Sequence, residues 1–297
     1  MGYLLLLLAT LAWSFVGVLV KTASTMVDSS IISFARFFFG VIFLGIYLLI
    51  KDRKIRLRTA FLWIWIGAAG KAVNYIFENI ALSIGFSYGN ILVQPVQTVV
   101  LLFTARLLLK EEISARGWVA SALCVLGVLI IGWNGLPLGE LLDGNGLTTL
   151  LYMLAGIGAA VHVWSQRVLV TSMDAGSMNF SVFLWSSLIT ALPIPVQSEG
   201  FTGPITFGAW GALIVLGIIT GLSFLSLAEA IKRVPFAIVA IVGNCSVFFT
   251  ILWSYLFFHE PITEYIISGT LVFVAGFLIL NLKLPSRAAK KESSLAT

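Results

Sequence analysis

The chain has 297 residues, of which 59% are hydrophobic and only 10% are charged, and its mean hydropathy is +1.04. Such a composition cannot supply a water-facing surface of ordinary size, so it excludes a soluble globular protein and indicates a polytopic membrane protein. The formal net charge of +5 does not point to nucleic-acid binding, because most of the basic residues fall in short loops and in the tail.

Membrane-spanning segments are expected wherever about 20 mostly apolar residues follow one another. The breaks between such segments carry charges or turn-forming residues. Ten segments qualify, and in chain order they are residues 3–20, 30–50, 61–82, 87–109, 117–133, 147–166, 178–196, 207–230, 236–258 and 264–282. The first has no basic segment before it and no small-residue cleavage site, so we expect a retained helix and not a cleaved signal.

Lysine and arginine in the loops predict the orientation of the spans. Fourteen of these residues lie in the connections that follow the even-numbered spans, or in the basic tail, residues 283–297. The opposite set of connections holds only Lys21. We therefore expect a protein of the inner membrane with both termini in the cytoplasm.

Two stretches that lie 149 residues apart nearly match. Residues 107–114 read LLLKEEIS and residues 256–263 read LFFHEPIT, and Gly127 and Gly276 follow them in register. This offset superposes the third to fifth spans on the eighth to tenth, so the repeating unit is five helices. Since five is odd, the second copy enters the membrane upside down.

The predicted fold is therefore all-α, with ten transmembrane helices arranged as two inverted five-helix repeats around a central cavity. The repeats are residues 1–133 and 147–282, and residues 134–146 form the linker loop. Inverted repeats are typical of secondary transporters, whose substrate site lies near the midplane between the halves. A duplicated structural scaffold without transport is the alternative.

The paired motifs, together with Pro95 in the fourth span and Trp13 in the first, resemble the drug/metabolite transporter superfamily. The resemblance is to its ten-helix branch, which contains bacterial exporters of amino acids and metabolites, and it covers essentially the whole chain. It implies a central cavity and secondary transport without ATP hydrolysis. In agreement, the sequence contains no G-x-x-x-x-G-K-[ST] phosphate loop.

Charged residues inside a membrane span are costly, and each one suggests a functional site. In the third span, Lys71, Asn74, Tyr75 and Glu78 follow i, i+3, i+4, i+7 spacing and share one helical stripe. Lys71 can hold a carboxylate near the midplane, and Glu78, about 10 Å further along the helix axis, can hold an amine. The structural alternative is an internal salt bridge between the two, or a pair whose side chains extend towards the loop, since Glu78 is not far from the outer end.

Other spans contribute further candidates. Asn90, Gln94 and Gln97 share a face of the fourth span beside Pro95, which produces either a binding site or a packing kink. In the paired first and sixth spans, aromatic groups can stack on a substrate, and His162 can alternatively carry a proton or be an ordinary hydrogen-bonded interior residue. The remaining candidates are Trp13, Trp164, Ser226 in the eighth span and Asn244 in the ninth.

Three more ionisable positions are expected to be structural. Arg36 in the second span is as easily explained by a tie to a neighbouring carbonyl or carboxylate as by substrate contact. Glu111 and Glu260, the acids of the paired motifs, are expected to accept hydrogen bonds from backbone N–H groups where the next helix starts.

The combined prediction is a secondary active transporter that exports a small polar or zwitterionic metabolite, an amino acid or related amine, by alternating access. Opposite charges beside aromatic faces suit a zwitterion. Its partners are the bilayer and the substrate, with coupling to protons or exchange, and a monomer is sufficient. Uptake or exchange of an amine-containing nutrient or cofactor is the alternative. An enzyme is not expected, because His162 and His259 lie in separate segments and form no catalytic or metal cluster, and no cofactor is expected.

Overall fold

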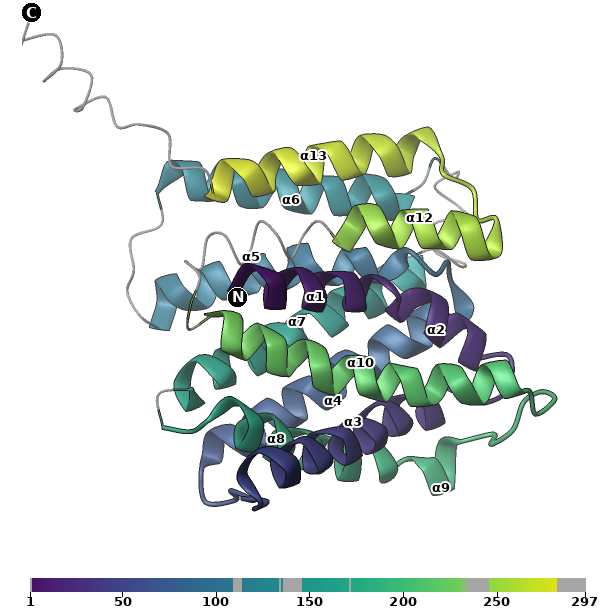
Figure 1. The fold of residues 1–297 in the computed structure, drawn as a ribbon. Helices are drawn as coiled ribbons and strands as arrows, with labels where there is room; N and C mark the ends of the chain where they lie inside the picture. The colour runs from purple at the N-terminus through teal and green to yellow at the C-terminus, as the bar shows by residue number, and fades with distance from the viewer. Residues whose placement is uncertain are drawn as a thin grey trace, which may run out of the picture.

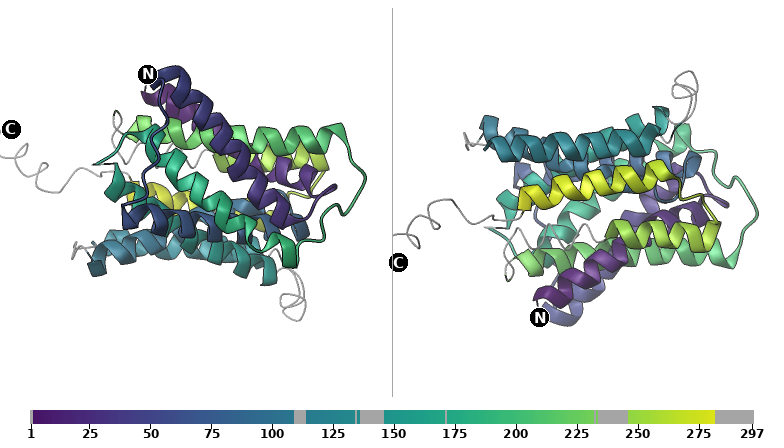
Figure 2. Two further views of the ribbon diagram at one scale, coloured as in Figure 1. Left: turned by 90° about the horizontal axis from the view of Figure 1, so that it is seen from below. Right: turned by 90° about the horizontal axis from the view of Figure 1, so that it is seen from above.

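The computed structural model describes residues 2–108, 114–133, 135, 146–170, 172–231, 233 and 246–281. These residues form a bundle of α-helices that run roughly along one direction (Figures 1 and 2). The helices of the first half are α1 (Gly2–Ser14), α2 (Val16–Ala23), α3 (Ser29–Asp52), α4 (Leu62–Ile84), the 3₁₀ helix η1 (Gly89–Leu92), α5 (Val93–Leu108) and α6 (Ala115–Trp133). Those of the second half are α7 (Gly146–Leu169), α8 (Ala175–Ala191), α9 (Ile194–Gln197), α10 (Phe207–Ile231), α12 (Ser246–Phe258) and α13 (Glu264–Asn281).

Length and apolar composition identify this as a multi-pass membrane protein. Five described segments are long and apolar enough to cross a bilayer, namely Gly2–Ala23, Ser29–Asp52, Gly146–Leu169, Ala175–Val196 and Phe207–Ala230. Helix α4 is equally long but falls outside that set, because its polar residues lower its hydropathy. Large apolar side chains such as Leu4, Ile50 and Phe257 are more than half exposed, as a lipid-facing surface requires.

The helices follow the predicted spans, with three internal differences. Phe15 separates α1 from α2 within the first span. The fourth span begins as the 3₁₀ helix η1, and Pro95 lies in the first turn of α5, where its missing N–H costs nothing, and not at a kink within a long helix. The seventh span divides into α8 and the short α9, which begins after Pro193. Residues 236–245 of the ninth predicted span lie outside the described residues.

Helices α6 and α13, which the repeat offset of 149 residues makes equivalent, pack directly on one another. Their backbones touch at glycines: a Cβ atom at Gly127 would lie 2.6 Å from the Gly269 carbonyl oxygen, and one at Gly276 would lie 2.7 Å from the Ala120 oxygen. A shift of 149 residues converts the first contact into the second. Position numbers rise along one helix as they fall along the other, so these equivalent helices run antiparallel.

The other contacts between the halves are also paired, because the first helix of each half packs on the third helix of the other half. The first helix of the second half, α7, packs on α4, while the first span of the first half, α1 and α2, packs on α10. The second helices of each half, α3 and α8, pack on one another and on the third helices. Helices α3, α4, α7, α8 and α10 are therefore linked by mutual packing into one group, and in Figure 1 α6 and α13 lie at the opposite edge from α3 and α8.

Aspartate N-caps begin the second helix of each half. Asp28 accepts hydrogen bonds from the Ser30 and Ile31 backbone N–H groups at the start of α3, and Asp174 accepts one from Ser177 N–H at the start of α8. Such caps satisfy N–H groups that the helix itself leaves without acceptors. The second helices of the two halves therefore begin with the same kind of N-cap.

Candidate functional site

Lys71 is buried, and the groups that it contacts directly are neutral. On α4, its side chain is buried, and Nζ donates to Asn74 Oδ1 at 2.7 Å. The ammonium also lies 4.2 Å from the centre of the Tyr75 ring and 4.4 Å from that of Phe224 on α10. The predicted stripe of Lys71, Asn74 and Tyr75 is therefore a contiguous group of contacts.

Glu78 pairs with Arg36 of α3 and not with Lys71. Arg36 Nη1 lies 3.5 Å from Glu78 Oε2 and donates to Asn79 Oδ1 at 2.7 Å, and the guanidinium stacks 3.6 Å from the Tyr75 ring centre. Arg36 is thus tied to a carboxylate, which is one of the two interpretations open for it from the sequence. The pair neutralises Glu78, so the role of Glu78 in holding a substrate amine stays a prediction and requires this pair to open.

The charge balance of the cluster leaves one cation uncompensated. The Arg36–Glu78 pair sums to zero, whereas Lys71 has an amide and two rings as its observed partners. Ring contacts of this kind contribute about 0.5–2 kcal/mol each, whereas a charge removed from water loses several kcal/mol of hydration. The cluster therefore carries one net positive charge, which a negative group would stabilise.

Three of the helices that contribute to this cluster carry buried polar atoms without a hydrogen-bond partner among the described residues. They include Asn74 Nδ2 on α4, His162 Nε2 on α7 and Ser223 Oγ on α10. His162 Nδ1 lies 3.1 Å from the Gly67 carbonyl oxygen, which can only accept, so the ring hydrogen is assigned to Nδ1 and Nε2 presents a lone pair. Buried polar groups are normally bonded, so unpartnered atoms from three helices are a reason to expect a ligand.

Aromatic rings complete the cluster, and they converge on Phe224. The Trp13 ring of α1 approaches it edge-on at 5.3 Å, the His162 ring of α7 at 5.4 Å and the Phe183 ring of α8 at 5.5 Å, all between centroids. Two predicted residues from equivalent first helices, Trp13 and His162, therefore meet on one ring.

The other predicted residues lie elsewhere. The Trp164 ring lies against Arg167, 5.9 Å from its guanidinium carbon, and Asn90 lies in η1, where its Oδ1 is buried without a partner. Gln94 is partly buried on α5. Ser226 is buried but follows Phe224 by two positions, about 200° around the helix. Asn244 lies outside the described residues.

Phe224, Phe183 and Ser223 were not predicted. A phenylalanine or serine within an apolar run is the commonest kind of residue in a membrane helix, so nothing in the sequence distinguishes these three. The pairing of α4 with α7 and of α1 with α10 selects them, and that pairing is a property of the fold.

A second polar network lies at the predicted outer end and joins the two halves. Glu260, just after α12, accepts hydrogen bonds from Ser87 N–H at 3.0 and 2.9 Å and from Ser87 Oγ at 2.8 Å. Lys21, at the end of α2, lies 3.1 Å from Glu260 and donates to the Gly85 carbonyl oxygen at 2.6 Å. We call Lys21, Ser87 and Glu260 the outer latch.

The latch corrects one expectation. Glu260 does accept a backbone N–H, but the donor is Ser87 in the opposite half and not the start of the following helix. The turn that makes this possible is local: His259 adopts a left-handed φ of 54° and ends α12, so the next residue leaves the helix axis. Glu111 lies outside the described residues.

Two pockets lie at opposite ends of the bundle. The outer one, about 260 Å³, is bordered by Lys21, Tyr88 and Tyr152, and the inner one, about 360 Å³, by Arg56, Arg58 and Asp174. Lys71 borders neither of these two pockets and its side chain is buried, and the central cavity stays a prediction. Within the described ranges, no three His, Cys, Asp or Glu side chains gather as a metal site.

Comparison with known proteins gives a consistent picture. The profile of the EamA-like transporter family matches the chain twice, over residues 1–133 and 146–282. The chain is 26% identical over 283 residues to the pseudopaline exporter CntI of Pseudomonas aeruginosa, and the alignment covers 94% of this chain and 95% of that relative. It is also 26% identical over 294 residues to YhbE of Escherichia coli K12, an uncharacterized inner membrane transporter, with 93% and 89% covered.

A solved crystal structure has the same fold. It superposes with a TM-score of 0.70 at 16% sequence identity, covering 95% of this chain and 98% of that chain.

Proposed function

The chain belongs to the EamA-like transporter family, so it is a membrane transporter and not an enzyme. We propose that it exports a small metabolite that carries a carboxylate, an amino acid or related zwitterion. The observation that carries this proposal is the uncompensated Lys71. A carboxylate would supply the missing negative charge, accept from Asn74 Nδ2 and lie beside the Phe224 ring.

The aromatic surroundings favour an amphipathic substrate. His162, Phe183 and Trp13 offer ring faces and edges around Phe224, on which an apolar or aromatic side chain can pack. The unprotonated Nε2 of His162 can accept from a substrate amine. A zwitterion thus finds a cation for its carboxylate and a neutral acceptor for its amine, without disruption of the Arg36–Glu78 pair.

Alternating access between two inverted halves is the proposed mechanism. The antiparallel packing of the equivalent helices α6 and α13, and the exchange of first helices between the halves, support it. We propose an inner-membrane location with cytoplasmic termini, for which the loop charges and the location given for YhbE are the support. Export follows the description of CntI, which is named an exporter.

A matched set of ligands tests the substrate class. L-phenylalanine has both charged groups, 3-phenylpropionate lacks the amine and phenethylamine lacks the carboxylate. We expect the first two to raise the Tm of the purified protein and phenethylamine to leave it unchanged, because a ligand that binds only the folded state stabilises it. Equal stabilisation by phenethylamine would contradict the role given to Lys71.

Transport in proteoliposomes tests the mechanism. With labelled L-phenylalanine inside the proteoliposomes, we expect saturable efflux of the label. If the protein exchanges substrates, unlabelled substrate outside should accelerate this efflux. Efflux that responds only to an imposed pH gradient indicates proton coupling. Efflux equal to that of empty liposomes would refute transport of this class.

A further inference from the structure

The outer pocket has walls from both halves of the chain. Lys21 comes from the end of α2, Gly85 and Phe86 from the connection after α4, and Thr148 and Tyr152 from the start of α7. Its volume of about 260 Å³ lies just below the range of about 300–1,000 Å³ typical of drug-sized ligands. A molecule the size of an amino acid, or one end of a larger molecule, fits this space.

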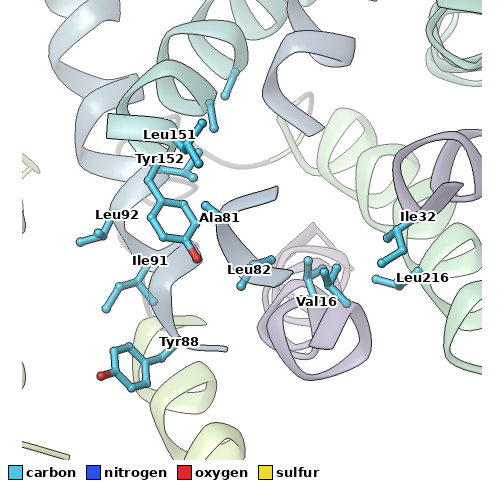
Figure 3. Packing of buried hydrophobic residues seen from close by; sticks show 14 of the residues in the cluster. Val16, Ile32, Ala81, Leu82, Tyr88, Ile91, Leu92, Leu151, Tyr152 and Leu216 are labelled. Atoms are coloured by element: carbon cyan, nitrogen blue, oxygen red, sulfur yellow. The ribbon is translucent and has the colours of Figure 1, made fainter. Parts of the chain in front are cut away.

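Two tyrosines on the wall of this pocket have hydroxyl groups without partners. Tyr88 is 4% exposed and Tyr152 is 2% exposed, and neither hydroxyl makes a hydrogen bond within the part of the chain that the structure describes. Figure 3 shows the Tyr152 ring extending towards Ala81 and Leu82 of α4. A Cβ atom at Gly89 would lie 2.4 Å from the Tyr152 hydroxyl, so the glycine is what allows the ring to occupy this place.

The unpartnered hydroxyls indicate what kind of ligand group is missing. A buried hydroxyl without a partner costs about 1–3 kcal/mol, and a phenol is a good donor to an anionic oxygen. Figure 3 shows the two hydroxyls pointing to different sides, so a ligand oxygen at each hydroxyl would recover that free energy. The two phenols come from different halves, Tyr88 just before η1 and Tyr152 on α7.

Lys21 adds a positive charge at the edge of the same pocket. Its side chain is 29% exposed, which leaves it accessible to a ligand. An ammonium has three N–H donors, and the Gly85 carbonyl oxygen and Glu260 account for two of them. A carboxylate in the pocket can take the third N–H, or displace Glu260 from Lys21.

From this geometry we propose that the outer pocket is a second binding site for a carboxylate, held by the hydroxyls of Tyr88 and Tyr152 and the ammonium of Lys21. As an exit site it rests on the proposed function, because the carboxylate is then that of the transported substrate. Occupation of the pocket weakens the latch, because ligand and Glu260 compete for Lys21.

Binding of radiolabelled L-phenylalanine to the detergent-purified full chain tests this site. The variants are Lys71→Met, which removes the central cation, and the double variant Tyr88→Phe/Tyr152→Phe, which removes only two hydroxyls. Each should lose about half of the saturable binding, and their combination all of it. Tyr255→Phe is the matched control, since Tyr255 is 53% exposed on α12 and borders no part of the pocket.

Measurements of the Tm distinguish a structural role of the two hydroxyls from a role in binding. Because they bond to nothing, their removal should leave the Tm unchanged or raise it, while binding falls. In the Lys71→Met background, Glu260→Gln should tighten the remaining binding several-fold, because Lys21 is released for the ligand. Weaker binding in that variant would overturn the competition between Glu260 and the ligand.

The outcomes distinguish the two proposals. If Lys71→Met abolishes all binding and the double tyrosine variant binds as wild type, the outer site is refuted and the proposed function stands. If the double tyrosine variant abolishes all binding and Lys71→Met has no effect, the outer site stands and the central site is refuted. No saturable binding to the wild-type chain would overturn both.

Discussion

At the outer end of the bundle, Glu260 accepts the backbone N–H and the hydroxyl of Ser87 and pairs with Lys21, whereas Lys71 on α4 has an amide and two rings as its observed partners. Both groups are buried, yet the carboxylate is paired with an opposite charge, whereas the ammonium contacts only neutral groups among the described residues. A network that serves the fold satisfies its own charges. The outer latch is therefore neutral in itself, whereas the Lys71 cluster carries one net positive charge, and this charge is the basis of the substrate proposed for it.

The largest effect is expected from Lys71→Met. Methionine keeps much of the length and removes the charge, so transport should fall at least about 100-fold, equivalent to about 2.7 kcal/mol of lost interaction. The ligand-free protein should be as stable as wild type or more so, because a buried unpaired charge is removed. Efflux from proteoliposomes and the Tm of the same preparation measure the two effects.

Lys51→Met is the control for this experiment. Lys51 is exposed in the last turn of α3, where its ammonium lies 5.4 Å from the Tyr47 ring centre, so its loss should change neither quantity appreciably. A Lys71→Met protein that unfolds more easily and still transports would reverse the comparison between the two networks.

Arg36→Met should cause the largest loss of stability. It leaves Glu78 buried without its partner, and the removal of one member of a buried pair costs about 3–5 kcal/mol. The double variant Arg36→Met/Glu78→Met should recover most of that loss, since it removes both charges together. Thermal unfolding in detergent measures both, with the exposed loop variant Arg56→Met as the control. No recovery in the double variant would mean that Arg36 acts chiefly through Asn79.

Glu260→Gln should have a smaller effect on stability, because Lys21 is partly exposed and water compensates it. We expect a loss of about 2 kcal/mol, from weaker hydrogen bonds with Ser87 that no longer involve a charged acceptor. Glu264→Gln, four residues further on and exposed, is the matched control. A Tm for Glu260→Gln equal to that of Glu264→Gln would show that the latch does not contribute to the stability of this conformation.

The helical architecture was largely predictable from the sequence, because long apolar runs with charged breaks have few alternative structures. The resemblance to the drug/metabolite transporters is confirmed by the family match over both halves of the chain. Trp13, Lys71 and His162 were recognised as candidates because polar and amphipathic groups are conspicuous in a membrane span. Their role as substrate ligands stays a prediction.

The partners of these residues were not predictable, because they depend on contacts between distant segments. Ser87 and Glu260 are 173 positions apart, and nothing near either one indicates the other. Phe224 is one of 22 phenylalanines, and only its place opposite α1 and α7 distinguishes it. The Lys71–Glu78 alternative failed for a related reason: Arg36 on α3 approaches Glu78, and a sequence pattern within one helix cannot include a competitor from another.

The smallest effect concerns Asp28, which ties the start of α3 to the segment before α10. Burial raises the pKa of this carboxyl, but hydrogen bonds from the Ser198 hydroxyl and from the backbone N–H groups of Ile31, Gly200 and Ser30 outweigh it, and the pKa is lowered overall. A lowered folded-state pKa contributes stability above the unfolded value of about 3.9, and this is lost as the pH falls through the folded value. Asp28→Asn should therefore lose about 1 kcal/mol near neutral pH and progressively less below pH about 4. Tm measured against pH, with the exposed Asp52→Asn at the other end of α3 as the control, tests this, and a difference from wild type that grows on acidification would have the wrong sign for a stabilising carboxylate.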